Sequence, residues 1–390
     1  MANDASDDNA LEKEGTGDDA PESGAPDLAV LPAKKTKTGA PWWAKVMVGV
    51  GAVLMVAAGG GAVYAKVMLD RINNAGTEKN LLGDGDSQAG EDIKGPLNLL
   101  MIGTDMRVND SDKIDRADSI MILHINKDLT KANIISVPRD LKVPCNDEPE
   151  GTCYTKVNGT YADGGETQEE RFQGLAESLS TLTGIKQFDG AAIIGFEGFL
   201  KAVKVLGSVE LCLPMDMQLH HQMKEQPNKP RTFKKGCHEY NQREALWIVR
   251  ERYAYSAENP DFDPDWGVGD YGRQHMQQHF IKQLLKKASE EGYITNPTKV
   301  GDLIDAVGST LTYHFRGHTP VDMAFALRGV KPNSMKTVRL PSETSMEGGE
   351  SFEVIPEGKP LTTTEELFKA LREDTMDEWI AENPKLLNKD

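Results

Sequence analysis

Leu97-Asn-Leu-Leu-Met-Ile-Gly103 is a short, nearly continuous apolar run that ends in glycine, a pattern typical of a buried strand. Two further apolar runs follow it, Asp118-Ser-Ile-Met-Ile-Leu-His-Ile-Asn126 and Ala132-Asn-Ile-Ile-Ser-Val137. The turn Lys127-Asp-Leu-Thr-Lys131 separates these two runs, and this arrangement predicts a hairpin.

Helical spacing of apolar residues begins downstream of these strands, from Thr167 to Leu182, and Gly184 suits the position just after a helix end. Further helices are expected at 197–206, 242–249, 273–288, 297–307 and 319–328, and further strands near 191–195, 209–213, 337–340 and 351–355. Mixed strands and helices with short connections predict an α/β (α+β) fold, in which helices flank a central mixed sheet.

Length and charge limit the possible classes of protein. A chain of 390 residues suggests two to three folding units, or one large domain with tails. Lysine and arginine total 44 and aspartate and glutamate total 61, so the net charge is −17. A strongly acidic chain is not expected to bind nucleic acid as its main partner. Only one segment is apolar enough to span a bilayer, which excludes a polytopic transporter.

That apolar segment predicts an N-terminal transmembrane helix at 44–66. The twenty uncharged residues from Val46 to Ala65 would cover the roughly 30 Å hydrocarbon core of a bilayer. The lysines before the segment outnumber the basic residues after it, so the N-terminus is expected to lie in the cytoplasm. Residues 1–40 are polar and show no apolar periodicity, so they are expected to be a disordered cytoplasmic tail. A cleaved signal peptide is the competing interpretation, and the long hydrophilic lead argues against it. We therefore predict a single-pass protein of the cell membrane whose later residues lie outside the cytoplasm.

The outer part divides by composition into three segments. Residues 67–96 are polar and rich in glycine and asparagine, and we expect a stalk there. The folded domain is expected at 97–372, and residues 373–390 are expected to be a polar C-terminal tail.

The four cysteines form two pairs that are close in sequence. Cys145 and Cys153 lie eight residues apart in a loop, and Cys212 and Cys237 bracket a second polar loop. Each pair could close its loop as a disulfide in an oxidising compartment, and four free thiols is the alternative.

Charged residues gather at the ends of the first three predicted strands. Asp105 follows the first strand, Arg116 and Asp118 precede the second, and Arg139 with Asp140 follows the third. If the strands are neighbours, these ends could converge at one edge, the usual place for a site in an open sheet. Two carboxylates close together repel each other unless a cation lies between them. Mg²⁺ with a phosphate ligand is a suitable cation, because it typically binds only one or two protein carboxylates. The guanidinium groups would bind the phosphate oxygens. Salt bridges at the strand ends are the alternative explanation.

Three more arginines occur in the second half of the chain. Arg250 and Arg252 end the helix predicted at 242–249, and Arg273 opens the next helix. A cation at a helix start is unfavourable to the helix dipole, whereas an anion there is favoured, so a bound phosphate would reconcile the two. Ordinary ion pairing with the acidic loop 261–270 is the alternative.

A set of short motifs occurs in one order along residues 97–290. The motifs are Gly103-Thr-Asp105-Met-Arg107, Asp115-Arg116-Ala-Asp118, Ser136-Val-Pro-Arg139-Asp140, Lys156-Val-Asn158, Phe196-Glu-Gly-Phe199, Gly207-Ser-Val-Glu210, Ala245-Leu-Trp-Ile-Val-Arg250-Glu-Arg252 and Asp270-Tyr-Gly-Arg273-Gln. In this order the chain resembles the LytR-CpsA-Psr family, actinobacterial type, with fainter similarity to about residue 372. A single-pass N-terminal anchor is also usual in that family.

The resemblance implies a phosphotransferase. Members of the family move a glycopolymer from a polyprenyl-pyrophosphate carrier to peptidoglycan or, in some actinobacteria, to a cell-wall protein. By matching position, Asp105 and Asp118 would hold Mg²⁺, and the lipid would lie in an apolar tunnel beneath the sheet. The residues implied to bind the pyrophosphate are Arg116, Arg139, Lys156, Arg250, Arg252, Arg273 and Gln277, of which Arg116, Arg139, Arg250 and Arg252 are the expected catalytic residues.

Two positions depart from the pattern of the family. Met276 stands where an arginine is common, which affects one phosphate contact, and Glu251 is also atypical. Asp140 could accept the proton of an acceptor hydroxyl, but a role in holding Arg139 is the preferred interpretation.

Two other function classes compete with the transferase. The same site with water as acceptor would be a polyprenyl-pyrophosphate pyrophosphatase. A non-catalytic module that binds the lipid carrier or scaffolds the wall machinery would keep its function without Arg139 or Asp118.

Overall fold

The computed structural model describes residues 76–83, 88–104, 116–146, 152–293, 296–308 and 310–388. The predicted cytoplasmic tail at 1–40, the predicted transmembrane helix at 44–66 and the predicted metal ligand Asp105 lie outside these residues. None of the helices in the described ranges is both long enough and apolar enough to cross a membrane.

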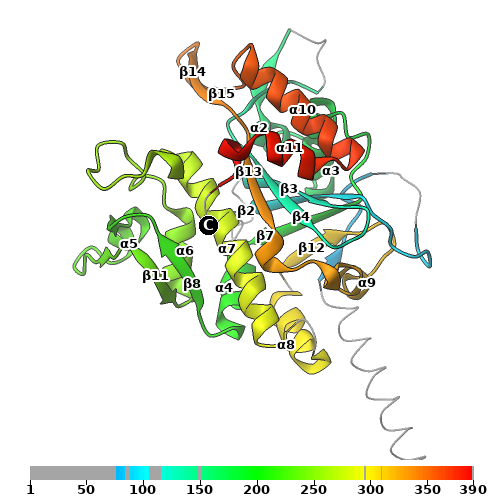
Figure 1. Cartoon of the computed structure of the whole chain (residues 1–390), viewed down its shortest axis with the longest axis horizontal. Coiled ribbons are helices and arrows are strands. Elements are labelled where there is room, and N and C mark those ends of the chain that lie inside the picture. Colours follow the sequence, from blue (N-terminus) through cyan, green and yellow to red (C-terminus); the bar gives the residue numbers. More distant parts are fainter. Residues whose placement is uncertain are drawn as a thin grey trace, which may run out of the picture. The chain divides into compact units, whose positions relative to one another are not determined.

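A mixed seven-stranded sheet forms the centre of the fold (Figure 1), as predicted. Its strands, in spatial order, are β1 (Thr77–Glu78), β12 (Leu311–His314), β7 (Gly190–Gly195), β2 (Leu97–Thr104), β3 (Ala117–Ile125), β4 (Ala132–Val137) and β13 (Lys336–Arg339). The strands β2, β3 and β4 are antiparallel neighbours, whereas β7 runs parallel to β2 and β13 runs parallel to β4. The three strands that the sequence predicts first are therefore adjacent in the sheet.

Both faces of the sheet are covered, which explains the nearly continuous apolar sequence of its central strands. Leu100 on β2 belongs to one buried cluster with side chains of α3 (Gln168–Thr183) and α10 (Lys359–Glu373). Leu99, the preceding residue, points to the other face and packs in a cluster with Ile281 and Leu285 of α7 (Asp270–Glu290). Successive side chains of a strand alternate between its two faces, so the sheet is a middle layer between helices.

A third buried cluster lies on the α7 side of the sheet. It joins β8 (Val209–Leu213) and β11 (Gly236–Tyr240), which pair antiparallel, with α6 (Gln242–Arg250) and α7. Asn241 caps α6, because its side chain accepts hydrogen bonds from the backbone N–H groups of Arg243 and Glu244. This cluster positions the end of α6 and the start of α7 beside the sheet.

The remaining elements are short and mostly connect the larger ones. They are β5 (Lys142–Pro144), β6 (Tyr154–Lys156), α2 (Val157–Ala162), α4 (Phe196–Val205), β9 (Met217–Gln218), α5 (His220–Glu225), β10 (Thr232–Phe233), α8 (Pro297–Gly308), α9 (Pro320–Ala326), β14 (Glu343–Glu347), β15 (Glu350–Val354) and α11 (Met376–Glu382).

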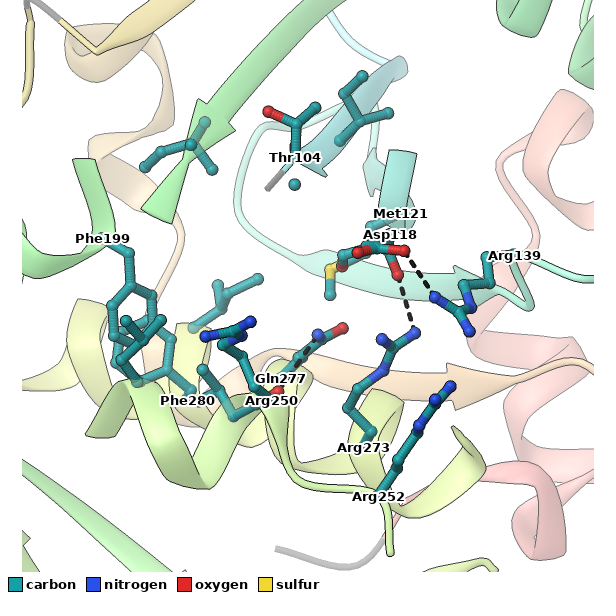
Figure 2. Close-up of a pocket in the computed structure, with 18 of the residues that line it drawn as sticks. Thr104, Asp118, Met121, Arg139, Phe199, Arg250, Arg252, Arg273, Gln277 and Phe280 are labelled. Carbon is teal, nitrogen blue, oxygen red and sulfur yellow. Dashed lines mark hydrogen bonds and ion pairs between the residues drawn. The ribbon is translucent and has the colours of Figure 1, made fainter. Parts of the chain in front are cut away.

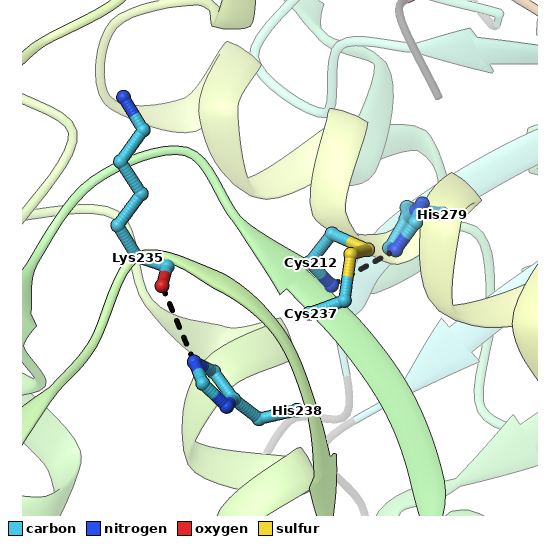
Figure 3. The surroundings of a disulfide bond; sticks show 5 residues. All are labelled: Cys212, Lys235, Cys237, His238 and His279. Atoms are coloured by element: carbon cyan, nitrogen blue, oxygen red, sulfur yellow. Dashed lines mark hydrogen bonds between the residues drawn. A yellow bond between two sulfur atoms is a disulfide. The ribbon is translucent and has the colours of Figure 1, made fainter.

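Both predicted cysteine pairs are disulfides in the structure. Cys145 joins Cys153 beside the β5–β6 hairpin, and Cys212 joins Cys237 across the β8–β11 pair. Figure 3 shows that His279 of α7 lies against the second disulfide, where its Nε2 accepts a hydrogen bond from the backbone N–H of Cys212, 3.2 Å away. This contact ties the β8–β11 pair to α7.

The C-terminal segment differs from the prediction. Residues 373–390 are not a plain polar tail, because α11 buries Met376 and Trp379 in the cluster that covers the sheet. The indole Nε1 of Trp379 donates a hydrogen bond to the backbone oxygen of Thr363 at 3.2 Å. The two apolar residues are three positions apart and so share one helix face, a signal too short to stand out among the charged residues around it.

Part of the predicted stalk is also structured. Within 67–96, β1 pairs with β12, and Leu81 is fully buried in the same cluster as α3. Two adjacent leucines, Leu81 and Leu82, give no periodic signal in a polar segment, so only the tertiary contact reveals them.

Candidate active site

A pocket of about 430 Å³ lies where β2, β3, α4, α6 and α7 meet. Figure 2 shows arginines from different elements on one side of it and aromatic side chains on another. Six of the residues predicted for the site line this pocket: Asp118, Arg139, Arg250, Arg252, Arg273 and Gln277. They come from two strand ends, the end of α6 and the first turns of α7.

Arg139, which follows β4, is held by carboxylates. Its Nη1 donates to Asp118 Oδ1 at 2.6 Å, and its Nε lies 3.3 Å from Asp140 Oδ2 and 4.0 Å from Asp270 Oδ1. Burial disfavours the charged form, but Asp118 and Asp270 outweigh this effect and raise the pKa of Arg139. The guanidinium is therefore a fixed positive charge at the pocket wall.

Arg273 lies one helical turn into α7 and is only 6% exposed. Its Nη2 is 2.8 Å from Asp270 Oδ1 and donates to the backbone oxygen of Asp118 at 2.9 Å. Its Nε is buried and has no hydrogen-bond partner among the described residues. Burial lowers the pKa of Arg273, with Asp270 opposing the shift. A buried cation with an unpaired N–H suits an anionic ligand.

The end of α6 brings Arg250 and Arg252 to the same wall, and the helix α7 adds Gln277. The amide Nε2 of Gln277 donates to the backbone oxygen of Val249 at 3.3 Å, so the two helices are linked at the pocket. The Oε1 atom of Gln277 is buried without a hydrogen-bond partner in the described part of the chain. It can accept from a ligand hydroxyl or a bound water.

Glu251 fixes the chain between the two arginines. It is fully buried, and its carboxylate accepts hydrogen bonds from four backbone N–H groups, those of His220, Arg252, Tyr253 and Ala254. Hydrogen bonds to a charged acceptor are among the stronger ones in proteins, so this carboxylate holds the turn in which Arg252 sits. In the sequence, Glu251 stands out only as a departure from the pattern of the family. Nothing in its neighbours along the chain signals this role, since one of the donors is about thirty residues away.

The other side of the pocket is apolar. Phe199 of α4 stacks on Phe280 of α7, with 4.2 Å between the ring centroids. Further apolar residues in the wall are Met101, Met121, Ile194, Leu246, Ile281 and Leu284. His221 also lines the wall, and burial together with the positive charge of Arg250 lowers its pKa to about 4. A neutral histidine adds no charge to the wall, whereas Lys224 of the same helix, α5, brings a cation to the lining.

Arg116 and Lys156, which were predicted to bind the same pyrophosphate, line a second cavity of about 610 Å³. Arg139 lines both cavities. Asp140 lies between them, with Oδ2 facing Arg139 and Oδ1 3.6 Å from Lys156 Nζ. Both oxygens thus face cations, which agrees with the expectation that Asp140 holds Arg139.

Within the described residues, no cluster of three or more histidine, cysteine, aspartate or glutamate side chains could hold a metal ion. Asp118 nevertheless places one carboxylate in the pocket, beside several guanidiniums. Mg²⁺ commonly binds through one or two carboxylates together with phosphate oxygens of a substrate. The donor set therefore fits an ion that arrives with, or is completed by, a phosphorylated ligand.

The cavity thus combines guanidinium groups and apolar side chains in one lining. The chain belongs to the LytR_cpsA_psr family, whose model matches residues 66–369. This match confirms the resemblance inferred from the motifs.

Relatives of known name come from several bacteria. The cell wall biosynthesis protein LcpA of Corynebacterium glutamicum is 27% identical over 265 residues, which cover 58% of this chain and 46% of that protein. The probable cell wall biosynthesis protein LcpB of the same organism is 28% identical, and the chain covers 52% of it. The chain therefore spans about half the length of these two relatives. The polyisoprenyl-teichoic acid–peptidoglycan teichoic acid transferase TagU of Bacillus cereus is 24% identical over 297 residues, which cover 73% of this chain and 83% of that one.

Solved structures share the fold. A structure described as TagT bound to LIIa-WTA aligns with a TM-score of 0.54 and 18% identity, covering 75% of this chain and 96% of that chain. TagV of Bacillus subtilis aligns with the same TM-score and 19% identity, covering 72% of this chain and 98% of the other. The central mixed sheet with flanking helices predicted from sequence is thus a fold known from other proteins.

Proposed function

We propose that this protein transfers a glycopolymer, with its linking phosphate, from a polyprenyl-pyrophosphate carrier to a cell-wall acceptor. One observation carries the proposal: a single cavity is lined both by the four arginines Arg139, Arg250, Arg252 and Arg273 and by aliphatic and aromatic side chains. A polyprenyl-pyrophosphate has the same two parts, a diphosphate and a hydrocarbon chain. The named relatives support the proposal, because the TagU protein of B. cereus is a teichoic acid transferase to peptidoglycan.

The residues suit the chemistry of phosphoryl transfer, which depends mainly on positioning and charge neutralisation. The acceptor hydroxyl oxygen forms a bond to the phosphorus that carries the glycan, and the bond from that phosphorus to the bridging oxygen breaks. Polyprenyl phosphate leaves, and the hydroxyl proton is released. Arg139, fixed by Asp118 and Asp140, and the buried Arg273 neutralise charge on the phosphoryl oxygens. Arg250 and Arg252 hold the second phosphate.

A magnesium ion belongs to this proposal. Asp118 would hold it, together with Asp105, which lies outside the described residues. When bound, Mg²⁺ would supply further positive charge to the diphosphate. The proposal also places the folded domain outside the cytoplasm, attached to the cell membrane by the segment 44–66, where two disulfides are stable.

The test uses the full chain in detergent micelles with a polyprenyl-pyrophosphate-linked oligosaccharide and uncrosslinked peptidoglycan strands. We expect a glycan–peptidoglycan conjugate and free polyprenyl phosphate in equal amounts, and we expect EDTA to reduce both at least tenfold and added Mg²⁺ to restore them. Release of lipid phosphate without any conjugate would identify a pyrophosphatase. Retention of the lipid without turnover would identify a binding or scaffolding module.

A further inference from the structure

The second cavity offers a site that the proposed function leaves unassigned. It lies between β6, α2 and the β14–β15 hairpin, and it meets the arginine pocket at Arg139, which lines both. Its volume of about 610 Å³ is typical of a ligand site. The two cavities differ in chemistry, since the first has apolar walls and the second is lined largely by polar and charged side chains.

We infer that this second cavity binds the acceptor, and that the acceptor is a sugar strand. The inference rests on the proposed function, and it assigns the side of the site from which the hydroxyl arrives. An in-line displacement requires the attacking and leaving oxygens to lie on opposite sides of the phosphorus. With the lipid in the apolar pocket and the phosphoryl group at Arg139, we place the approach of the hydroxyl in the second cavity, which shares Arg139 with the first.

The lining of the second cavity matches the two surfaces of a sugar ring. Tyr154 at its rim is 48% exposed, and Lys142 Nζ lies 4.6 Å from the centroid of its ring, which holds the ring in place. Phe352 is a second, nearly buried ring in the wall. An aromatic ring receives the C–H face of a sugar, while the hydroxyl groups of the sugar need polar partners.

Those polar partners surround the rings. Asn158 and Glu350 line the same cavity and can donate to and accept from sugar hydroxyls or an acetamido group. Lys156 lies 3.6 Å from Asp140 and 5.6 Å from the ring centroid of Phe352, so it stands between the sugar-binding wall and Arg139. An acceptor seated on Tyr154 and Phe352 would thus have its hydroxyl next to the cations that hold the phosphoryl group.

The experiment measures transfer by the full chain to uncrosslinked peptidoglycan strands, with the variants Tyr154→Ala, Tyr154→Phe and Glu350→Gln. We expect Tyr154→Ala and Glu350→Gln to raise the KM for the strands at least fivefold and to lower the ratio of conjugate to hydrolysed donor. Tyr154→Phe keeps the ring and loses only the hydroxyl, so it should raise the KM less than Tyr154→Ala does. Met346→Ala is the matched control, because Met346 lies on the same hairpin, is 67% exposed and lines neither cavity.

The outcomes separate this inference from the proposed function. A KM for the strands that stays within twofold in both Tyr154→Ala and Glu350→Gln overturns the acceptor site, even if the natural protein forms conjugate. Transfer only to a serine- or threonine-bearing cell-wall protein overturns the sugar strand as acceptor and keeps the transferase. No conjugate with either acceptor removes the proposed function itself. Melting temperatures of the variants check that each remains folded.

Discussion

Arg139 illustrates how a single residue can be fixed by neighbours that its sequence position does not reveal. Its guanidinium lies against three carboxylates: Asp118 of the neighbouring strand β3, Asp140 beside it in the chain and, at 4.0 Å, Asp270 from the start of α7. A side chain restrained in this way needs little reorganisation when a phosphoryl group binds. Preorganised charge is the main means by which proteins stabilise developing negative charge.

Replacing Arg139 should therefore impair turnover more than folding. We expect Arg139→Ala to reduce the rate of polyprenyl phosphate release at least tenfold, since a lost charge contact in the transition state costs on the order of 3 kcal/mol. Arg139→Lys keeps the charge but loses the two-pronged contact, so its rate should lie in between. Arg243→Ala, on the exposed face of α6, is the control. A folded Arg139→Ala protein with the natural rate would contradict the assigned role.

His221 makes the stability of the folded protein depend on pH. Burial and Arg250 lower its pKa from 6.5 to about 4, so the folded protein favours the neutral ring. Below about pH 6.5 the unfolded chain takes up this proton first, which stabilises the unfolded state progressively down to about pH 4. We expect the melting temperature to fall from pH 7 to pH 5 and the fall to be smaller in His221→Gln. His238→Gln, an exposed histidine on β11, should show the same fall as the natural protein.

At the scale of elements, the sequence patterns predict the central strands and most helices well. The expected strands 97–103, 118–126 and 132–137 correspond to β2, β3 and β4 to within one residue at each end. These strands are buried on both faces, so their apolar pattern is continuous and clear. Several elements were not predicted, including the helix α10; among them β1, β12 and α11 are each short and give little periodic signal.

The residue types of the candidate site can be predicted from the sequence, but the distribution of these residues over two cavities cannot. Charged residues at strand ends indicate a common edge, and Asp118, Arg139 and Arg273 do meet. The separation of Arg116 and Lys156 into a second cavity depends on the β14–β15 hairpin, which contributes Glu350 and Phe352 to its wall. That hairpin is about two hundred residues further along the chain, and no local pattern places it there.

The helix α11 should contribute to stability despite its polar sequence. Trp379 is 4% exposed and packs in the cluster below the sheet. We expect Trp379→Ala to lower the free energy of unfolding by about 3–5 kcal/mol, from lost burial and the cavity left behind. Glu378→Ala, exposed on the same helix, should change it by less than about 0.5 kcal/mol. Denaturant unfolding of the full chain measures both, and equal stability of the two variants would mean that α11 does not pack as described.

The Cys212–Cys237 disulfide should act on α7 as well as on its own loop. It joins β8 to β11, and the Cys212 backbone is hydrogen-bonded to His279 on the helix that carries Arg273. We expect the Cys212→Ser/Cys237→Ser double variant to be about 2–4 kcal/mol less stable, as for loops of this kind. Reductant should lower the melting temperature of the natural protein in the same direction. If reductant leaves the melting temperature unchanged, the disulfide does not contribute to the stability of the fold.

For the whole molecule, the question is how a chain of net charge −17 would bind the anionic donor of the proposed reaction. The Debye length is about 10 Å at 0.1 M salt, so charges on distant surfaces are largely screened from the pocket. The arginines of the pocket act at contact distance and are partly buried, where screening is weaker. Local charge rather than total charge should therefore decide the affinity.

Two variants with the same change in total charge separate the effect of local charge from that of total charge. Arg250→Gln/Arg252→Gln and Lys234→Gln/Lys235→Gln each make the chain more negative by two charges, but only the first pair lies at the pocket. We expect titration calorimetry of the full chain with inorganic pyrophosphate and Mg²⁺ to give a Kd at least tenfold higher for the arginine variant than for the natural protein. The lysine variant should stay within twofold of the natural protein, because Lys234 is exposed and pairs with Asp216 away from the cavity. Equal losses in the two variants would mean that pyrophosphate senses only the overall charge, and the arginine pocket would then have no special part in binding the donor.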